Sequence, residues 1–311
     1  MIKIRIEDNL QETIKTEHYI DIKKRAKDTI EKVKGIAKYK KLCEYIFDVS
    51  GNIDDDKLEK LITGNKNELI KIIDVIGKIT LDKNDPFDKL YNNFTKRDWS
   101  KSLLEKLGVK VCPYCNRQYT FTLRNDGIRP QFDHYFPKSL FAYLSVSLFN
   151  LVPSCSICNS KKHALNTYEA INDLYYPYED EFGNDVVFQT YSDGHDFSYW
   201  TGNSDNFDLK LVVKDNIHSN KIENLNKYLK IELLYKQHKD YVKDIIRNAV
   251  IYNDSRINEL LEQFPSLFYS KNEILNSIFM SYIDKEGWGK RPLSKLTHDI
   301  YEEFKIFSSI E

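Results

Sequence analysis

Two pairs of cysteines with Cys-x-x-Cys spacing constrain this chain more than any other feature. The first pair is Cys112 and Cys115, and the second is Cys155 and Cys158. In a reducing compartment, this spacing is typical of zinc ligands rather than of disulfides. Four thiolates close a tetrahedral site and leave no position for a substrate, so we expect a structural Zn²⁺. The alternative is four buried thiols that bind no metal.

The segment between the two pairs has the pattern of a β-hairpin. About forty residues separate the pairs, which exceeds the spacing of a zinc ribbon, so another element must lie between them. Residues 118–123 alternate polar and apolar side chains and precede Asn125-Asp126-Gly127, a turn signal. Residues 131–136 resume as a strand. We therefore predict that residues 119–124 pair with residues 131–135.

Polar residues in this segment suit the hydrolysis of a phosphodiester. Asp133 and His134 are adjacent at the end of the predicted strand, Asn150 follows, and Asn159 comes directly after the last cysteine. Imidazole has a pKa near about 6.5, so neutral His134 is able to take a proton from water. The oxygens of Asp133 and Asn159 suit a catalytic Mg²⁺ or Mn²⁺. Asn150 is expected to hold the loop and the His134 ring in register.

The charge of this segment favours an anionic ligand. Between Cys112 and Asn166, six basic and two acidic residues give +4, so the remainder of a chain with net charge −1 carries −5. Clustered cations of this kind bind phosphates. The candidates for phosphate contacts are Lys138, Lys161, Lys162 and His163.

The pattern Asp-His…Asn…Cys-x-x-Cys-Asn-x-x-Lys, ending at Lys162, resembles the HNH endonuclease family over about 55 residues. The resemblance implies a ββα-metal fold, with a hairpin, a helix and one catalytic metal ion. It also implies that Asp133 is a metal ligand, His134 the general base and Asn150 the central Asn. The last residue of the family motif is often His and is Asn159 here, so either Asn159 or His163 completes the metal site.

A narrower likeness is carried by residues 129–138, 150–155 and 291–294. These segments resemble the PtuB-like HNH subunits of Septu and related retron-associated anti-phage systems. That resemblance implies a prokaryotic antiviral defence role and an ABC-type ATPase partner of the PtuA-like kind. The acidic helical arms would then be either a docking surface for this partner or only a scaffold.

Outside the cysteine segment, apolar residues recur mainly at helical spacing among Lys and Glu. Strand-like runs occur at residues 186–188, 197–200 and 209–213. We expect an α+β, mostly helical protein containing a zinc-stapled ββα-metal HNH core. The expected division is an N-terminal helical region (1–108), the nuclease core (109–175), and a mixed strand segment followed by C-terminal helices (176–311).

Localisation is predicted from two patterns. No apolar run approaches the roughly 18 residues of a membrane span, and the N-terminus lacks the pattern of a signal peptide. We therefore expect a cytoplasmic protein with no membrane partner.

Two functional hypotheses follow. The first is a metal-dependent endonuclease acting on nucleic acid, with DNA favoured over RNA. The second is a zinc module that binds nucleic acid or protein without cleaving it. Both need the four cysteines, whereas only the first needs Asp133, His134 and Asn150.

Overall fold

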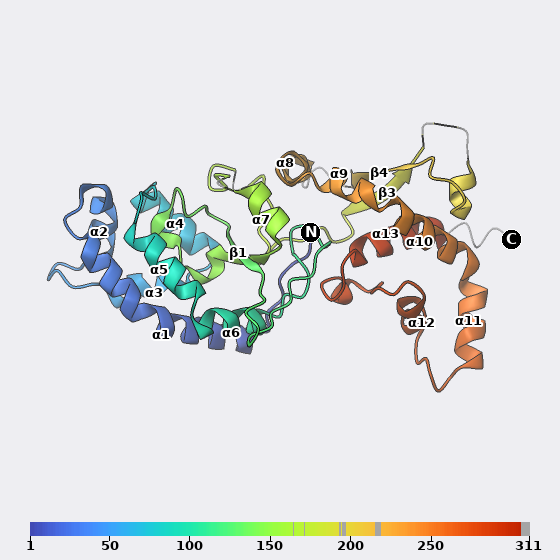
Figure 1. Ribbon diagram of the computed structural model, residues 1–311, viewed down its shortest axis with the longest axis horizontal. Coiled ribbons are helices and arrows are strands. Elements are labelled where there is room, and N and C mark those ends of the chain that lie inside the picture. The colour runs from blue at the N-terminus through green and yellow to red at the C-terminus, as the bar shows by residue number, and fades with distance from the viewer. Residues whose placement is uncertain (164, 171, 193, 195–196, 215–218, 306–311) are drawn as a thin grey trace. The chain divides into compact units, whose positions relative to one another are not determined.

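The computed structural model describes residues 1–163, 165–170, 172–192, 194, 197–214 and 219–305. Within them, it is a mostly helical α+β structure, as the sequence predicts, and it contains two small antiparallel two-stranded sheets (Figure 1). No helix among these residues is long and apolar enough to cross a membrane.

The chain divides into two compact units. We call Ile4–Val109 with Thr120–Asn172 the N-terminal unit, and Met1–Lys3 with Lys110–Tyr119 and Asp173–Glu311 the C-terminal unit. This partition differs from the expected boundaries at 108 and 175. Residues 120–172 pack with the N-terminal helices, and residues 110–119 pack with the C-terminal helices.

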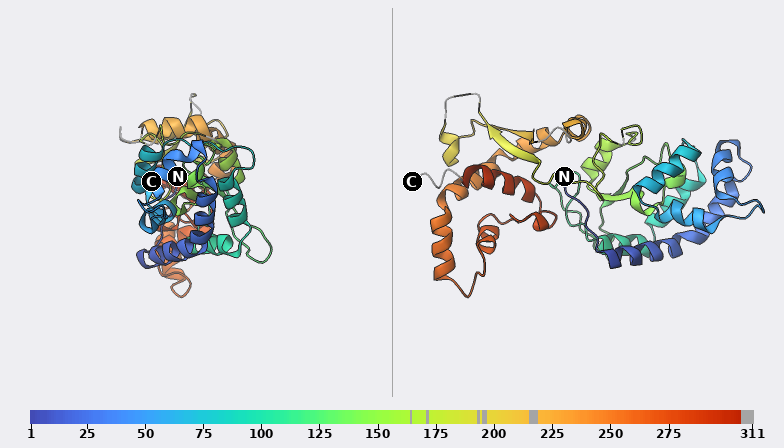
Figure 2. Two further views of the ribbon diagram at one scale, coloured as in Figure 1. Left: turned by 90° about the vertical axis from the view of Figure 1, so that its left-hand side faces the viewer. Right: turned by 180° about the vertical axis from the view of Figure 1, so that it is seen from behind.

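Helix α1 is the longest helix of the N-terminal unit and packs against α3, α5 and α6 (Figures 1 and 2). Two helix starts follow directly from the sequence. The Asp54 side chain accepts hydrogen bonds at the start of α3, and Asp85 caps α5 with Pro86 as its first residue. The helices are α1 (Asp8–Val33), α2 (Lys40–Ile46), α3 (Asp55–Thr63), α4 (Lys66–Ile76), α5 (Pro86–Thr95), α6 (Asp98–Leu107) and α7 (Ser156–Lys162).

The predicted hairpin partner of residues 131–135 is wrong. Strand β1 (Gln131–His134) pairs with β2 (Leu151–Ser154), with Gln131 opposite Ser154 and His134 opposite Leu151. The turn at 125–127 does form, but it closes only a single bridge between Leu123 and Ile128. The reason is burial. Strand β2 is buried along its whole length and supplies the apolar partner that β1 needs, whereas the side chain of Leu123 is about half exposed.

Strand β1, strand β2 and helix α7 follow one another in this order, and α7 packs against β1. Successive side chains of a strand point to opposite faces. Asp133 therefore shares the α7 face of β1 with Gln131, while His134 points to the other face, toward α5.

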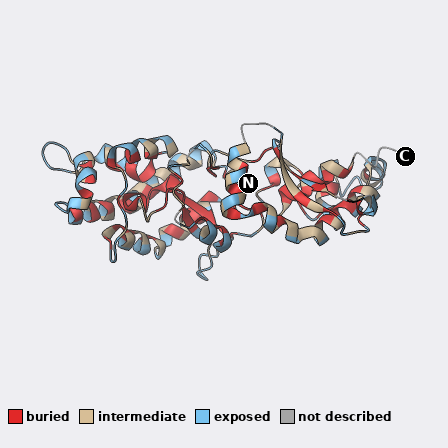
Figure 3. Ribbon diagram, turned by 90° about the horizontal axis from the view of Figure 1, so that it is seen from above, coloured by how far each residue is buried: buried red, intermediate tan, exposed pale blue. Residues whose placement is uncertain are grey.

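The C-terminal unit combines one sheet with a helical layer. Strands β3 (Val186–Tyr191) and β4 (Asp208–Val213) confirm two of the three predicted strand segments. The third prediction is wrong, because residues 197–201 form a 3₁₀ turn that Gly202 ends at φ 70°. The helices are α8 (Ser219–Leu229), α9 (Ile231–Tyr235), α10 (Lys239–Ile251), α11 (Asp254–Gln263), α12 (Lys271–Ile278) and α13 (Ser294–Phe304). Buried positions follow the inner faces of the helices in each unit (Figure 3).

Candidate functional site

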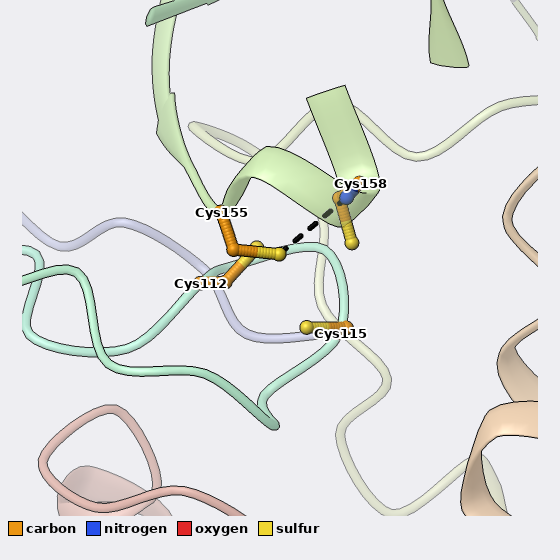
Figure 4. A group of neighbouring side chains, drawn as sticks. All are labelled: Cys112, Cys115, Cys155 and Cys158. Atoms are coloured by element: carbon orange, nitrogen blue, oxygen red, sulfur yellow. Dashed lines mark hydrogen bonds between the residues drawn. The ribbon is translucent and has the colours of Figure 1, made fainter. Parts of the chain in front are cut away.

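The four cysteines of the two Cys-x-x-Cys pairs form a buried cluster (Figure 4). Their sulfur atoms all lie within 4.8 Å of one another, and none forms a disulfide. A zinc ion with Zn–S bonds of about 2.3 Å would hold four sulfurs about 3.8 Å apart. The cluster is therefore consistent with a structural zinc site, and its all-thiol donor set leaves no ligand position for a substrate.

Local backbone geometry supports the role of these sulfurs as anionic ligands. The backbone N–H of Cys158 donates to Cys155 Sγ at 3.4 Å, and the N–H of Arg117 donates to Cys115 Sγ at the same distance. Cys155 is also the N-cap of α7, where the helix dipole favours negative charge. Both pairs thus direct backbone dipoles at a sulfur.

Asn116 anchors the first cysteine pair within the C-terminal unit. Its backbone has φ 50°, a left-handed conformation that Asn tolerates. The fully buried carboxamide donates to the Trp288 carbonyl at 2.8 Å and accepts from the Lys295 N–H at 3.2 Å. In addition, Tyr235 Oη donates to the Cys115 carbonyl at 2.6 Å. The Leu293 N–H also donates to the Asn116 carbonyl at 2.6 Å, and this bond ties the segment of residues 291–294 to the loop of the first pair.

Asp133 is paired with a buried cation. Lys162 Nζ lies 3.2 Å from Asp133 Oδ1 and 3.1 Å from Oδ2, and both side chains are at most 5% exposed. The same ammonium donates to the carbonyls of His134 at 2.7 Å and Tyr135 at 3.0 Å. Burial lowers the pKa of Lys162, and the neighbouring carboxylate acts against that shift. The Lys162 side chain therefore points inward to β1, and it is not a surface cation.

His134 lies on the opposite face of β1 and is 7% exposed. Its Nε2 is 2.8 Å from the Ser145 carbonyl, and because a carbonyl only accepts, Nε2 carries the proton. The Tyr91 ring and the imidazole pack in a T-shaped arrangement, with 4.6 Å between their centroids. Burial lowers the pKa of His134 to about 3, with Lys138 and Lys162 adding repulsion. The ring is therefore neutral near pH 7, and Nδ1 is its basic nitrogen.

The other ring nitrogen of His134, Nδ1, makes no hydrogen bond among the described residues. The tautomer therefore leaves Nδ1 as an unprotonated, neutral base in a residue that is 7% exposed.

Asn150 is fully buried and holds the loop that follows His134. Its Oδ1 accepts from the Phe136 N–H at 2.7 Å, and its Nδ2 donates to the carbonyls of Phe136 at 3.0 Å and Leu144 at 3.1 Å. The Tyr135 N–H also donates to the Asn150 carbonyl at 2.9 Å. These bonds fix the backbone directly after His134.

Asn159 and His163 occupy different environments on α7. Asn159 Nδ2 donates to Gln131 Oε1 at 2.7 Å, so Asn159 reaches the same face of β1 as Asp133 and leaves its own Oδ1 available. His163 is the exposed C-cap residue of α7. Lys161 is exposed in the last turn of α7.

Lys138 lies near the face of β1 that carries His134. Its ammonium is 2.6 Å from Asp88 Oδ1 and 4.5 Å from the centre of the Tyr91 ring. Asp88 and Tyr91 both come from α5, so this helix supplies groups around His134 that no spacing motif identified. Their only sequence signal was the helical period that puts positions 88 and 91 on one face.

The oxygens of Asp133 and Asn159 fit a divalent ion in part. A carboxylate offers about four lone-pair sites, and Lys162 takes one on each oxygen. The available Oδ1 of Asn159 adds an amide oxygen from the same side of the strand. An ion there would share Asp133 with an ammonium, which would weaken its binding.

Comparison with known proteins gives no assignment: no protein-family model, no curated protein and no solved structure matches this chain.

Proposed function

We propose that the protein is a metal-dependent nuclease of the HNH type that hydrolyses phosphodiester bonds in nucleic acid. The observation that supports this most directly is the state of His134. Its Nε2–H is fixed on the Ser145 carbonyl, so Nδ1 is the unprotonated nitrogen, and it makes no hydrogen bond among the described residues. Asn150 holds the adjoining loop, and the cysteine cluster adjoins α7 at Cys155 and Cys158.

In this proposal, His134 Nδ1 takes a proton from water as the water oxygen bonds to phosphorus. The bond from phosphorus to the leaving oxygen breaks, and that oxygen receives a proton from solvent. A base with a pKa of about 3 is weak. A phosphodiester beside the ring would raise the pKa, because a nearby negative charge favours the protonated imidazole.

A divalent ion such as Mg²⁺ or Mn²⁺, held by Asp133 and Asn159, would supply Lewis-acid stabilisation of the phosphate charge. These two residues lie on the face of β1 opposite to the His134 ring, so the proposal requires the phosphate to reach both faces where the strand ends at His134. Lys162 fixes the Asp133 carboxylate against α7. Zinc in the cysteine cluster would have a structural role only. The cations proposed to contact a phosphate are Lys161, which is exposed, and Lys138, whose ammonium pairs with Asp88.

The decisive experiment compares the wild-type chain with His134→Gln on DNA and RNA in the presence of Mg²⁺ or Mn²⁺. Gln retains an N–H donor for the Ser145 carbonyl but has no basic nitrogen. Cleavage is expected to fall by at least about 10²-fold, the usual contribution of a general base. Equal cleavage by both proteins would exclude His134 as the base.

The buried Asp133–Lys162 pair favours a second candidate, a zinc-containing module that binds nucleic acid or protein without cleaving it. A carboxylate neutralised by an internal ammonium has a sufficient structural role. Under this alternative, the wild-type chain binds its ligand but cleaves neither DNA nor RNA with either metal ion.

The narrower resemblance extends the proposal to an anti-phage defence role with an ABC-type ATPase partner. This extension is tested by co-expression with an ATPase encoded beside the chain. Co-purification and a rise in nuclease activity would support it. The absence of such a neighbouring gene would argue against it.

A further inference from the structure

A basic groove between α1 and α5 lies apart from the candidate catalytic residues in the N-terminal unit. Its volume is about 300 Å³. Helix α1 contributes Arg25, Thr29 and Lys32 from one helical face, and α5 contributes Lys89 and Asn93. On each helix these positions follow the spacing of three or four residues that puts side chains on one face.

The charges of this groove are not neutralised from within. Of the residues that line the groove, Arg25, Lys32 and Lys89 are cationic and only Asp28 is acidic. Among the described residues, Lys32 and Lys89 have no ion-pair partner, while Lys23 and Lys27 on the same helix α1 pair with Asp55. The guanidinium of Arg25 lies 3.5 Å from a carboxylate oxygen of Asp21, so the charge of Arg25 is partly neutralised by Asp21. The residues that line the groove therefore carry a net charge of +2, and they include the hydroxyl of Thr29 and the carboxamide of Asn93.

We propose that this groove binds phosphate groups of a nucleic-acid strand. Residues 25 to 32 of α1 span about 10 Å of helix axis, which is longer than one phosphate group and suits a run of backbone phosphates. Cations, a hydroxyl and a carboxamide are the groups that contact nucleic-acid backbones without reading sequence. The inference rests on the proposed nuclease function for its choice of polymer.

Helix α5 connects this groove with the candidate catalytic residues. Asp88 and Tyr91 face Lys138 and His134, whereas Lys89 and Asn93 line the groove. One rigid helix thus carries both sets of residues. A strand held in the groove would be positioned by the same element that packs on the His134 ring.

Binding is tested by fluorescence anisotropy with the full chain and labelled mixed-sequence single-stranded and duplex DNA, in buffer without divalent ions. Lys89→Glu and Lys32→Glu are each expected to weaken binding about 10-fold and to make the dependence of log affinity on log salt shallower by about one. The matched control is Lys71→Glu, which makes the same charge change at an exposed position on α4 that does not line the groove. Urea unfolding verifies that all three variants remain folded.

The outcomes separate the alternatives. Equal weakening by all three substitutions would indicate net charge rather than this groove, and no binding by the wild-type chain would overturn the proposal. Inorganic pyrophosphate serves as the second ligand. Suppose that pyrophosphate binds the wild-type chain but not Lys89→Glu, while both proteins bind DNA equally. The ligand of the groove is then a small phosphorylated compound, and the nucleic-acid assignment is wrong.

The same assay distinguishes the groove from the nuclease proposal. DNA binding that depends on Lys89, without cleavage in Mg²⁺ or Mn²⁺, would support the groove as a binding site and exclude the nuclease function. Cleavage that depends on His134, with DNA binding that is unaffected by substitution of Lys89 or Lys32, would support the nuclease function and exclude the groove.

Discussion

Lys162 on α7 and Asp133 on β1 form a buried ion pair, with the ammonium 3.1 and 3.2 Å from the two carboxylate oxygens. The ammonium also bonds to two carbonyls of the chain directly after Asp133. The pair thereby fastens the helix to the strand on which the candidate base lies.

Lys162→Met is expected to lower the free energy of unfolding by about 3–5 kcal/mol, because it leaves the Asp133 carboxylate buried without a partner. Lys161→Met on the same helix is the matched control, since this side chain is exposed and should matter by no more than about 0.5 kcal/mol. Urea unfolding measures both. Equal effects would show that the buried pair does not stabilise the fold.

The Lys162→Met variant also tests Asp133 as a metal ligand. Without the competing ammonium, a divalent ion at Asp133 should restore part of the stability that the substitution removes, because ligands of the native state stabilise it. Unfolding curves with and without millimolar Mg²⁺ measure this. A variant that gains nothing from Mg²⁺ or Mn²⁺ would argue against Asp133 as a ligand.

Removal of a cysteine from the cluster should remove the zinc. Cys155→Ser is expected to lower both the bound zinc and the melting temperature, since structural zinc contributes directly to folding. Cys43→Ser, at the cysteine outside the cluster, is the control and should keep the metal. Elemental analysis and thermal unfolding give the readouts. A Cys155→Ser protein with full zinc content and unchanged melting would rule out the site.

The N-terminal unit should become less stable in mild acid because of two buried histidines. Burial lowers the pKa of His18 to about 4 and that of His134 to about 3. Between pH 6.5 and these values the unfolded chain binds protons that the native chain excludes, so the free energy of unfolding falls as pH falls. The decrease is roughly 1.5 kcal/mol for each histidine between pH 6.5 and pH 5.

His18→Gln measures the share of one histidine. Gln is able to donate to the Val146 carbonyl and accept from the Trp99 indole N–H, as His18 does. Urea midpoints at pH 7 and pH 5 should differ less in this variant than in the wild type. Burial raises the pKa of Asp299 to about 6 and that of Glu303 to about 7, and these groups have the opposite sign. An unchanged pH dependence in His18→Gln would contradict the assignment.

Substitution of Asn150 should mainly affect stability, whereas substitution of Asn159 should mainly affect metal-dependent activity. Asn150→Ala leaves the N–H of Phe136 and two carbonyls without their buried partner, so we expect the free energy of unfolding to fall by at least about 3 kcal/mol. Asn159→Ala removes a single half-exposed hydrogen bond to Gln131 and should cost less than about 1 kcal/mol. If Asn159 is a metal ligand, its variant should instead need more Mg²⁺ for half-maximal cleavage. A stable Asn150→Ala protein would show that the loop does not depend on this carboxamide.

The sequence by itself determined the features that depend on local spacing. Two Cys-x-x-Cys pairs defined a four-thiol set, and Asp85-Pro86 marked the start of α5, since ligand loops and helix caps are set within a few residues. The tertiary structure alone decided the rest. Strand β1 pairs with β2 rather than with the nearer segment because pairing follows burial, which is a property of the whole fold.

The environment of each candidate catalytic residue likewise depends on the tertiary structure. Spacing identified Lys162 as a basic residue after a motif, but only the packing of α7 on β1 turned its ammonium inward to Asp133. Tyr91 and Ser145 lie 43 and 11 positions from His134 along the sequence, so no local pattern connects them to it. Side-chain burial, tautomer and the charge left uncompensated in a groove depend on residues brought together from distant segments, and chain folding alone determines them.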